Sequence, residues 1–140
     1  MLVRDVITRH LKTIDSHASL RQAAAMMREL DVGVLPVSEG DEVVGIVTDR
    51  DITIRGTATG AAPDDTPVAH IYSPGVVFAR EDDDIAAAAE IMEERQVRRL
   101  LVVDGDDQCV GIVSLGDLAL RAGDDGLGGE ILQQVSKPAH

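Results

Sequence analysis

The stretch Val110-Gly111-Ile112-Val113-Ser114-Leu115-Gly116-Asp117 has a twin earlier in the chain, Val44-Gly45-Ile46-Val47-Thr48-Asp49-Arg50-Asp51. Each copy is an apolar run that ends at a hydroxyl residue, and an aspartate follows three positions later. This pattern predicts a buried strand that turns directly into a helix. A hydroxyl and a carboxylate held together at such a turn can face a small polar ligand.

The rest of the chain also occurs twice, with a period near 65 residues. The opening segment 3–8 matches 68–73, a shift of 65, whereas Gly45 and Gly111 differ by 66 because the second hairpin turn has one extra residue. Each copy reads strand, helix, strand, strand, helix. We therefore predict an α+β fold of two β-α-β-β-α repeats packed about a pseudo-twofold axis, because neither copy alone can cover both faces of its sheet.

Repeat one is assigned to residues 1–55 and repeat two to 68–122. Between them, 56–67 is small, polar and contains two prolines, which predicts a linker. Residues 123–140 are expected to form a flexible glycine-rich join and a C-terminal segment with one or two helical turns. The long helices are expected to present matching apolar faces, and Ser19 with Gln22 predicts a capping box in the first. These faces comprise Leu20, Ala23, Ala24, Met27 and Leu30 in repeat one, and Ile85, Ala88, Ala89 and Met92 in repeat two.

Composition excludes several classes of function. The 140 residues carry a formal net charge of −12, with one Tyr, one Phe and no Trp. Proteins that bind nucleic acid need basic residues for the phosphates and aromatic rings for the bases. This chain is therefore not expected to bind nucleic acid. Anionic membrane surfaces are disfavoured by the same charge. No apolar run approaches the roughly 20 residues that span a bilayer, and no secretory signal opens the chain, so we expect a cytoplasmic protein.

Cysteine and histidine usage gives no sign of a metal site. Cys109 is the only cysteine and lies in an apolar strand, which favours a small packed hydrophobe over a reactive thiol. The four histidines show neither i,i+4 pairing nor a neighbouring cysteine, so no metal is expected. Met26, Met27 and Met92 are assigned to core packing.

Taken together, these motifs resemble a tandem pair of CBS domains, the module named after cystathionine β-synthase. The resemblance covers about residues 1–122 and rests on segments 35–37, 45–51, 97–104 and 111–117. It implies two clefts that bind adenosine-containing ligands such as AMP, ADP, ATP, S-adenosylmethionine or NAD. It also implies a stand-alone regulatory module of the bacterial stress-response sort, in which two pairs dimerise face to face into a disc.

Ser114 and Asp117 are the strongest candidates for ligand contact. A carboxylate can accept hydrogen bonds from both ribose hydroxyls, and the resemblance assigns these positions to ribose and phosphate. Ser-x-x-Asp is also a plain capping box, and the two roles can coexist. Arg98 and Arg99 precede a buried strand and are expected to emerge beside Ser114, to grip a phosphate or simply to lie solvated at the rim. The resemblance completes this favoured cleft with Thr8, Lys12, Thr13, Ile112 and Gly116.

Thr48 and Asp51 offer the same pair in repeat one, but Val32-Gly33-Val34 stands where the arginines would be. Arg50 is the one residue that could compensate. We expect this cleft to be weaker for phosphate-rich ligands, and either empty or occupied only by a nucleoside. The resemblance implies that Tyr72, Val77 and Phe78 line this cleft. It also implies that the adenine ring lies beside the aliphatic side chain of Ile46.

The sequence favours a nucleotide sensor over an enzyme. No nucleophile–base set is visible, and Gly126-x-Gly128 does not follow a strand as a phosphate loop requires. No cofactor is required; an adenine nucleotide is the expected regulatory ligand, with Mg²⁺ possible alongside ATP, and a second copy and an unidentified protein are the expected partners. The alternative is an interaction or dimerisation scaffold in a stress response. Its clefts stay empty, and changes along helix 85–95 disrupt its assembly.

Overall fold

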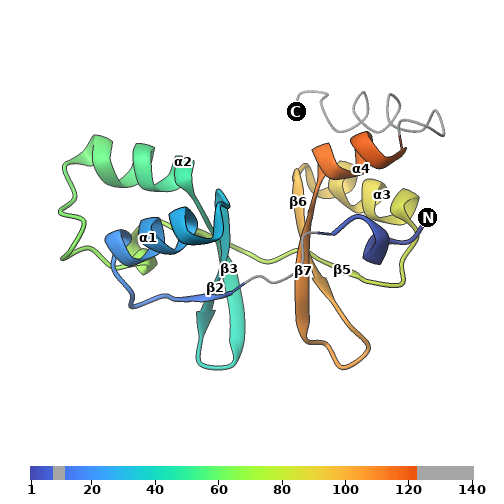
Figure 1. Cartoon of the computed structure of the whole chain (residues 1–140), viewed down its shortest axis with the longest axis horizontal. Coiled ribbons are helices and arrows are strands. Elements are labelled where there is room, and N and C mark those ends of the chain that lie inside the picture. Colours follow the sequence, from blue (N-terminus) through green and yellow to red (C-terminus); the bar gives the residue numbers. More distant parts are fainter. Residues whose placement is uncertain (8–11, 123–140) are drawn as a thin grey trace. The chain divides into compact units, whose positions relative to one another are not determined.

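The computed structural model of the chain describes residues 1–7 and 12–122. Within these ranges the chain forms two compact units. The first-repeat unit comprises residues 12–76, and the second-repeat unit comprises residues 1–7 together with 77–122. Each unit has one sheet with helices against one of its faces (Figure 1).

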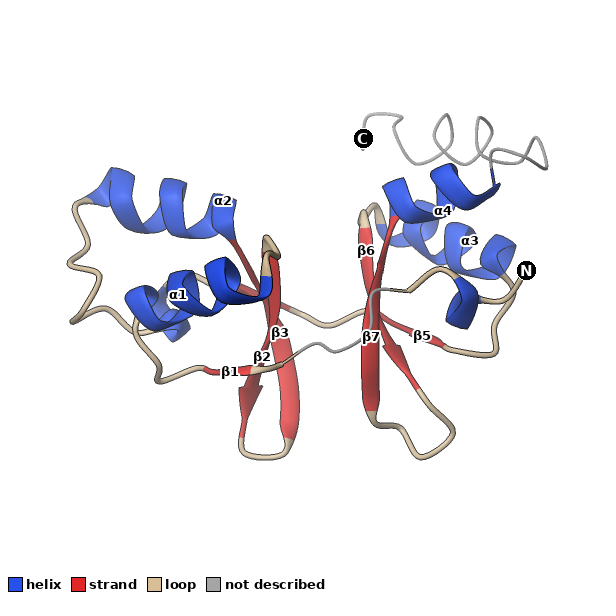
Figure 2. Ribbon diagram, in the orientation of Figure 1, coloured by secondary structure: helices blue, strands red, loops and turns tan. Residues whose placement is uncertain are grey.

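The first-repeat unit contains a four-stranded sheet in the order β1-β2-β3-β4. β1 runs parallel to β2, and the other neighbours are antiparallel. α1 and α2 lie on the same side of this sheet (Figure 2). The elements are β1 (Ile14–Asp15), α1 (Leu20–Leu30), β2 (Val34–Glu39), β3 (Glu42–Thr48), α2 (Asp49–Asp51) continued by a π-helical turn (Ile52–Gly56) and a 3-10 turn (Thr57–Thr59), a second 3-10 turn (Val68–His70) and β4 (Ser73–Pro74).

The second-repeat unit has a three-stranded sheet in the order β5-β6-β7, with β5 parallel to β6 and β6 antiparallel to β7. α3 and α4 cover one face of it (Figure 2). Both units therefore show the predicted β-α-β-β-α order, which confirms the α+β fold class. The elements are a 3-10 turn (Val3–Asp5), β5 (Phe78–Arg80), α3 (Ile85–Arg95), β6 (Arg99–Val103), β7 (Cys109–Ser114) and α4 (Leu115–Ala122).

The start of α1 is the predicted capping box. Ser19 Oγ accepts from the Gln22 backbone N–H at 3.1 Å, and Gln22 Oε1 accepts from the Ser19 N–H at 2.9 Å. The apolar face is narrower than predicted, because Ala24 is exposed whereas its counterpart Ala89 in α3 is buried. The prediction for these methionines is confirmed. Met27 and Met92 lie in the cores of their units, and Met26 packs against the core of the first-repeat unit.

The opening segments of the two repeats are exchanged between the cores. Val3 and Val6 pack among residues 79–118 in the core of the second-repeat unit, and the Val3 N–H donates to the Asp83 carbonyl at 2.8 Å. Val68 and Ile71 lie in the core of the first-repeat unit. The compact units therefore exchange the opening segments of the sequence repeats 1–55 and 68–122. Apolar burial is non-directional, so the pattern of these segments does not say which core receives them.

The predicted linker 56–67 is tied to the start of α1 rather than free. The first N–H groups of a helix have no partner within the helix. Here the Leu20 N–H donates to the Thr66 carbonyl at 3.0 Å, and the Arg21 N–H donates to the Pro63 carbonyl at 3.1 Å. Arg21 also pairs with the Asp64 carboxylate on the surface. This segment therefore caps a helix as well as joining the repeats.

The structure also bears on the expectations for Cys109 and for membrane-spanning segments. Cys109 is only partly buried, and burial raises the pKa of its thiol, which lowers the reactive thiolate fraction at neutral pH. Within the described ranges, no helix is both long and apolar enough to cross a membrane. The predicted C-terminal join and segment at 123–140 lie outside the described residues.

Candidate nucleotide-binding corners

Ser114 and Asp117 meet where β7 turns into α4. The Asp117 N–H donates to Ser114 Oγ at 3.0 Å, and the Ser114 N–H donates to Asp117 Oδ2 at 3.0 Å. This reciprocal box fixes the carboxylate at the helix start. Among the described residues, Asp117 Oδ1 has no hydrogen-bond partner, and both side chains are partly exposed. One oxygen thus serves the cap while the other can accept hydrogen bonds from a ligand.

Arg98 and Arg99 lie beside this corner along the backbone. Arg99 stands opposite Ser114 in the antiparallel β6–β7 register, and the Leu115 N–H donates to the Arg98 carbonyl at 2.8 Å. Both arginine side chains are exposed. The backbones of two arginines, at and just before the start of β6, therefore lie next to the corner at the end of β7.

Gly116 adds a backbone donor to the same place. The neighbouring N–H groups of Leu115 and Asp117 are taken by Arg98 and Ser114, but the Gly116 N–H has no acceptor in the described part of the chain. Gly116 is exposed, and the nearest atom to a β-carbon built on it is Ser114 Oγ at 3.7 Å. The first turn of α4 thus offers an accessible N–H at the positive end of the helix dipole.

Thr48 and Asp51 form the matching corner where β3 turns into α2. The same reciprocal box is present, with both N–H to side-chain oxygen distances at 3.0 Å. Asp51 is only 9% exposed, and its Oδ1 lies 3.8 Å from Arg55 Nε. Arg55 also donates to the Ile71 carbonyl at 3.5 Å. Both carboxylate oxygens are therefore engaged, in contrast to those of Asp117, and sequence reasoning did not identify Arg55.

Tyr72 packs on β3 at Gly45, three residues before the second corner. β4 pairs with β3 so that Ser73 stands opposite Ile46, and a β-carbon on Gly45 would lie 2.7 Å from the Tyr72 ring and closer still to the Ser73 carbonyl. The aromatic ring therefore packs directly on the glycine backbone. Proximity of this kind depends on the tertiary fold and has no signal in the local sequence.

Replacing Gly45 by alanine is expected to destabilise the first-repeat unit by about 1–3 kcal/mol, because the new methyl group must displace Tyr72 and β4. Chemical denaturation measures the loss. Gly105→Ala is the matched control, since nothing lies within 4 Å of a β-carbon built there and its φ is not in the left-handed region. Equal stability of the two variants would contradict the packing of Tyr72 on Gly45.

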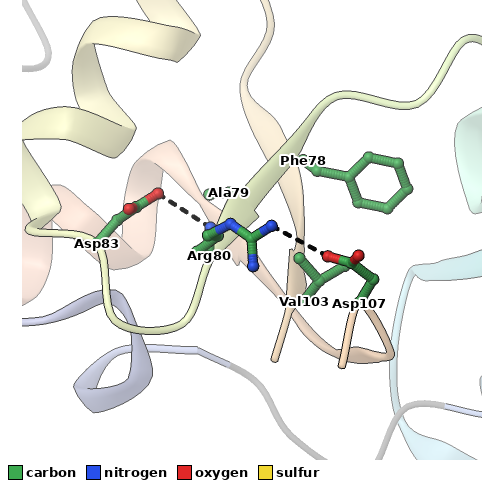
Figure 3. A pocket seen from close by; sticks show the side chains of 6 residues that line it. All are labelled: Phe78, Ala79, Arg80, Asp83, Val103 and Asp107. Carbon is green, nitrogen blue, oxygen red and sulfur yellow. Dashed lines mark hydrogen bonds and ion pairs between the residues drawn. The ribbon is translucent and has the colours of Figure 1, made fainter. Parts of the chain in front are cut away.

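A hollow of about 420 Å³ lies elsewhere in the second-repeat unit. It is lined by Phe78, Ala79 and Val103, with Arg80, Asp83 and Asp107 around it (Figure 3). The Arg80 guanidinium donates to Asp107 at 3.1 Å, and the Arg80 N–H donates to Asp83 at 3.0 Å. It borders the Val103 end of β6, whereas the Ser114 corner adjoins the Arg99 end. The hollow and the corner are thus separate features of this unit.

Several residues predicted to line a cleft belong to one unit, whereas the aspartate of that cleft belongs to the other. Lys12 and Thr13, assigned to Asp117, belong to the first-repeat unit and are exposed. Val77 and Phe78, assigned to Asp51, belong to the second-repeat unit. Their ligand roles stay predictions, and Thr8 lies outside the described residues. Of the two isoleucines expected beside adenine, Ile112 is buried and Ile46 is partly exposed.

The described residues contain no group of three His, Cys, Asp or Glu side chains that could hold a metal ion. His17 is exposed and pairs instead with Asp15, its ring Nδ1 lying 3.1 Å from Asp15 Oδ1. The His17 backbone N–H, which donates to that carboxylate at 2.8 Å, holds the pKa of Asp15 below its ordinary value.

Comparison with known proteins shows where this architecture recurs. The family profile of the CBS domain matches residues 3–55 and 68–123. The CBS domain-containing protein YhcV of Bacillus subtilis is 35% identical over 134 residues, covering 96% of this chain and 94% of YhcV. Hypoxic response protein 1 of Mycobacterium tuberculosis is 34% identical over 117 residues, covering 83% of this chain and 81% of that protein.

Solved structures with the same fold include several with bound ligands or ions. The CBS domain pair of MJ0100, in complex with 5′-methylthioadenosine and S-adenosyl-L-methionine, is 27% identical with a TM-score of 0.74 and covers 89% of this chain and 98% of its own. CBSX2 in complex with AMP is 25% identical, with a TM-score of 0.66 and the same coverages. Hypoxic Response Protein I, with two coordinated zinc ions, is 33% identical with a TM-score of 0.70, covering 86% and 98%.

Proposed function

Because this chain belongs to the CBS domain family, we propose that it is a regulatory module that binds an adenine nucleotide at the Ser114–Asp117 corner and catalyses no reaction. One observation carries the proposal. A carboxylate oxygen without a partner among the described residues, an exposed glycine at the helix start and two exposed arginines occur on neighbouring residues where β7 enters α4. Relatives of the same fold in complex with AMP and with S-adenosylmethionine support it.

The chemistry of the corner suits the two polar parts of a nucleotide. Asp117 Oδ1 can accept hydrogen bonds from the ribose hydroxyls, which are stronger than neutral hydrogen bonds because the acceptor is charged. The Gly116 N–H and the guanidinium groups of Arg98 and Arg99 can donate to phosphate oxygens. In a chain of net charge −12, this local pair of cations is what makes a phosphate ligand acceptable.

The Thr48–Asp51 corner is proposed as the weaker site. Asp51 is already paired with Arg55, and Gly33 and Val34 stand where the other repeat has Arg98 and Arg99. A ligand at either corner can act as a signal only if it binds two arrangements of the protein with different affinity. The reader of that signal is proposed to be a second copy or a further protein partner, in a stress response of the kind that Hypoxic response protein 1 is named for.

A dimerisation scaffold is the second candidate function. The helical segments that follow the two corners expose apolar residues at equivalent positions, Ile54 at 47% and Leu120 at 79%. Each of these side chains would lose its contact with water if another protein surface covered it, which is a favourable change. In this case adenosine ligands would leave stability unchanged, while Leu120→Glu would alter the oligomeric state measured by light scattering.

The deciding experiment is a thermal-shift panel of AMP, ADP, ATP, NAD and S-adenosylmethionine, with and without Mg²⁺. A ligand at 100 times its Kd adds about 2.7 kcal/mol to the free energy of unfolding, which corresponds to a rise in Tm of roughly 5–10 °C for a chain of this length. We expect AMP or ATP to produce such a rise. Absence of a shift with every adenosine ligand would refute the sensor function and favour the scaffold.

A further inference from the structure

The two corners superimpose in their backbone hydrogen bonds but not in their charges. The Asp49 N–H donates to the Gly33 carbonyl at 3.0 Å, as the Leu115 N–H donates to the Arg98 carbonyl. Val34 stands opposite Thr48 as Arg99 stands opposite Ser114. Over the six equivalent positions (33, 34 and 48–51; 98, 99 and 114–117), the first corner holds two carboxylates and one arginine. The second holds two arginines and one carboxylate.

Asp49 is responsible for much of this difference. Its Oδ1 accepts from the Arg50 N–H at 2.9 Å, and its Oδ2 lies 2.9 Å from the position of a β-carbon on Gly33. The carboxylate therefore lies against the backbone site from which Arg98 projects in the other repeat. Gly33 leaves the room that this carboxylate needs.

The Arg50 N–H is the equivalent of the Gly116 N–H, and Asp49 already occupies it with a negative oxygen. In the other corner the residue at this position is Leu115, which is 3% exposed and packs in the core, so no anion is built in. A phosphate approaching the Thr48–Asp51 corner meets a carboxylate where it would find a free N–H in the Ser114–Asp117 corner. Like charges repel, and the exposed position of Asp49 makes the repulsion sensitive to salt.

Building on the function proposed above, we propose that Asp49 is a specificity-determining residue that excludes phosphate from the Thr48–Asp51 corner. The corner accepts only adenosine ligands without a 5′-phosphate, such as uncharged nucleosides or those with a cationic 5′ substituent. Phosphorylated ligands are confined to the Ser114–Asp117 corner. One chain then reports on two chemically distinct adenosine ligands.

The test isolates the first corner by using full-length Asp117→Asn, which disables the other carboxylate, and compares adenosine with AMP by calorimetric titration. Adenosine is expected to bind more tightly than AMP. Adding Asp49→Asn is expected to raise AMP affinity about fivefold, the size of one screened like-charge contact, and to leave adenosine affinity unchanged. The gain is expected to shrink at roughly 0.5 M salt. Asp41→Asn, in the exposed β2–β3 turn of the same unit, is the matched charge control and should change neither affinity.

Equal affinity for AMP and adenosine in Asp117→Asn would overturn the role of Asp49. An AMP affinity that does not change when Asp49→Asn is added would overturn it too. Failure of adenosine to bind Asp117→Asn, while the unaltered chain still binds AMP, would also overturn it and leave the sensor function standing. If the unaltered chain binds no adenosine ligand at all, the proposed function itself fails. The two failures are therefore distinguishable.

Discussion

Replacement of Asp117 by alanine is expected to weaken AMP binding by roughly 100-fold or more and to abolish the AMP-induced rise in Tm. Each hydrogen bond to a charged acceptor contributes about 1.5–3 kcal/mol, and the proposed site loses two such bonds to ribose. The capping box with Ser114 is lost as well, which lowers the free energy of unfolding by about 1 kcal/mol. Titration calorimetry and thermal unfolding measure the two effects separately.

Two control variants separate binding from capping. Asp117→Asn retains an oxygen for the Ser114 N–H, so it should keep most of the stability while losing AMP binding. Asp51→Ala removes the equivalent cap in the first-repeat unit, so it should lose stability while keeping AMP binding at the other corner. AMP affinity that survives in Asp117→Asn but falls in Asp51→Ala would reverse the assignment of the favoured site.

Val3→Asp is expected to unfold the second-repeat unit, although Val3 stands 74 positions before Val77, where the larger part of that unit begins. Val3 is fully buried in the core that contains Leu100 and Met92. The substitution loses an apolar contact and buries a carboxyl group without a partner, at a cost of roughly 4 kcal/mol or more. Hydrogen exchange should show lost protection in α3 and β6, with α1 and β2 retaining theirs.

The repeat supplies mirror-image controls for this prediction. Val68→Asp should have the opposite pattern, because Val68 is buried in the core of the first-repeat unit. Arg4→Asp places the same side chain one residue further on, at an exposed position, and should be nearly neutral. Lost protection in α1 rather than α3 after Val3→Asp would show that the opening segments are not exchanged.

Much of this molecule could be predicted because its decisive interactions are local. The strand-to-helix corners depend on a hydroxyl and an aspartate three residues apart, and both boxes form as the spacing requires. The cap of α1 by Ser19 and Gln22 is equally short in range. Hydrophobic periodicity gave the order of elements in each repeat, and the family profile matches those same segments.

The prediction of contacts was less complete where a residue's hydrogen-bond or ion-pair partner lies far away in the sequence. The linker carbonyls that cap α1 and the Ile71 carbonyl that holds Arg55 are unremarkable in sequence. The difference between Asp51, whose oxygens are both engaged, and Asp117, which keeps one available among the described residues, also depends on such contacts. The shared hydroxyl-x-x-Asp spacing therefore did not indicate that one aspartate is engaged on both oxygens and the other on one.

The sequence by itself determined the duplicated architecture, the capped corners and the charge contrast between Arg98-Arg99 and Gly33-Val34, because periodicity and short-range hydrogen bonding are written in neighbouring residues. Only the tertiary structure decided which core receives each opening segment and where the Asp49 carboxylate lies. Burial of a valine is equally favourable in any apolar core. The position of the Asp49 carboxylate depends on the space beside Gly33 and on a nearby hydrogen-bond donor, which the fold provides. Neither choice can be inferred from the pattern of neighbouring residues.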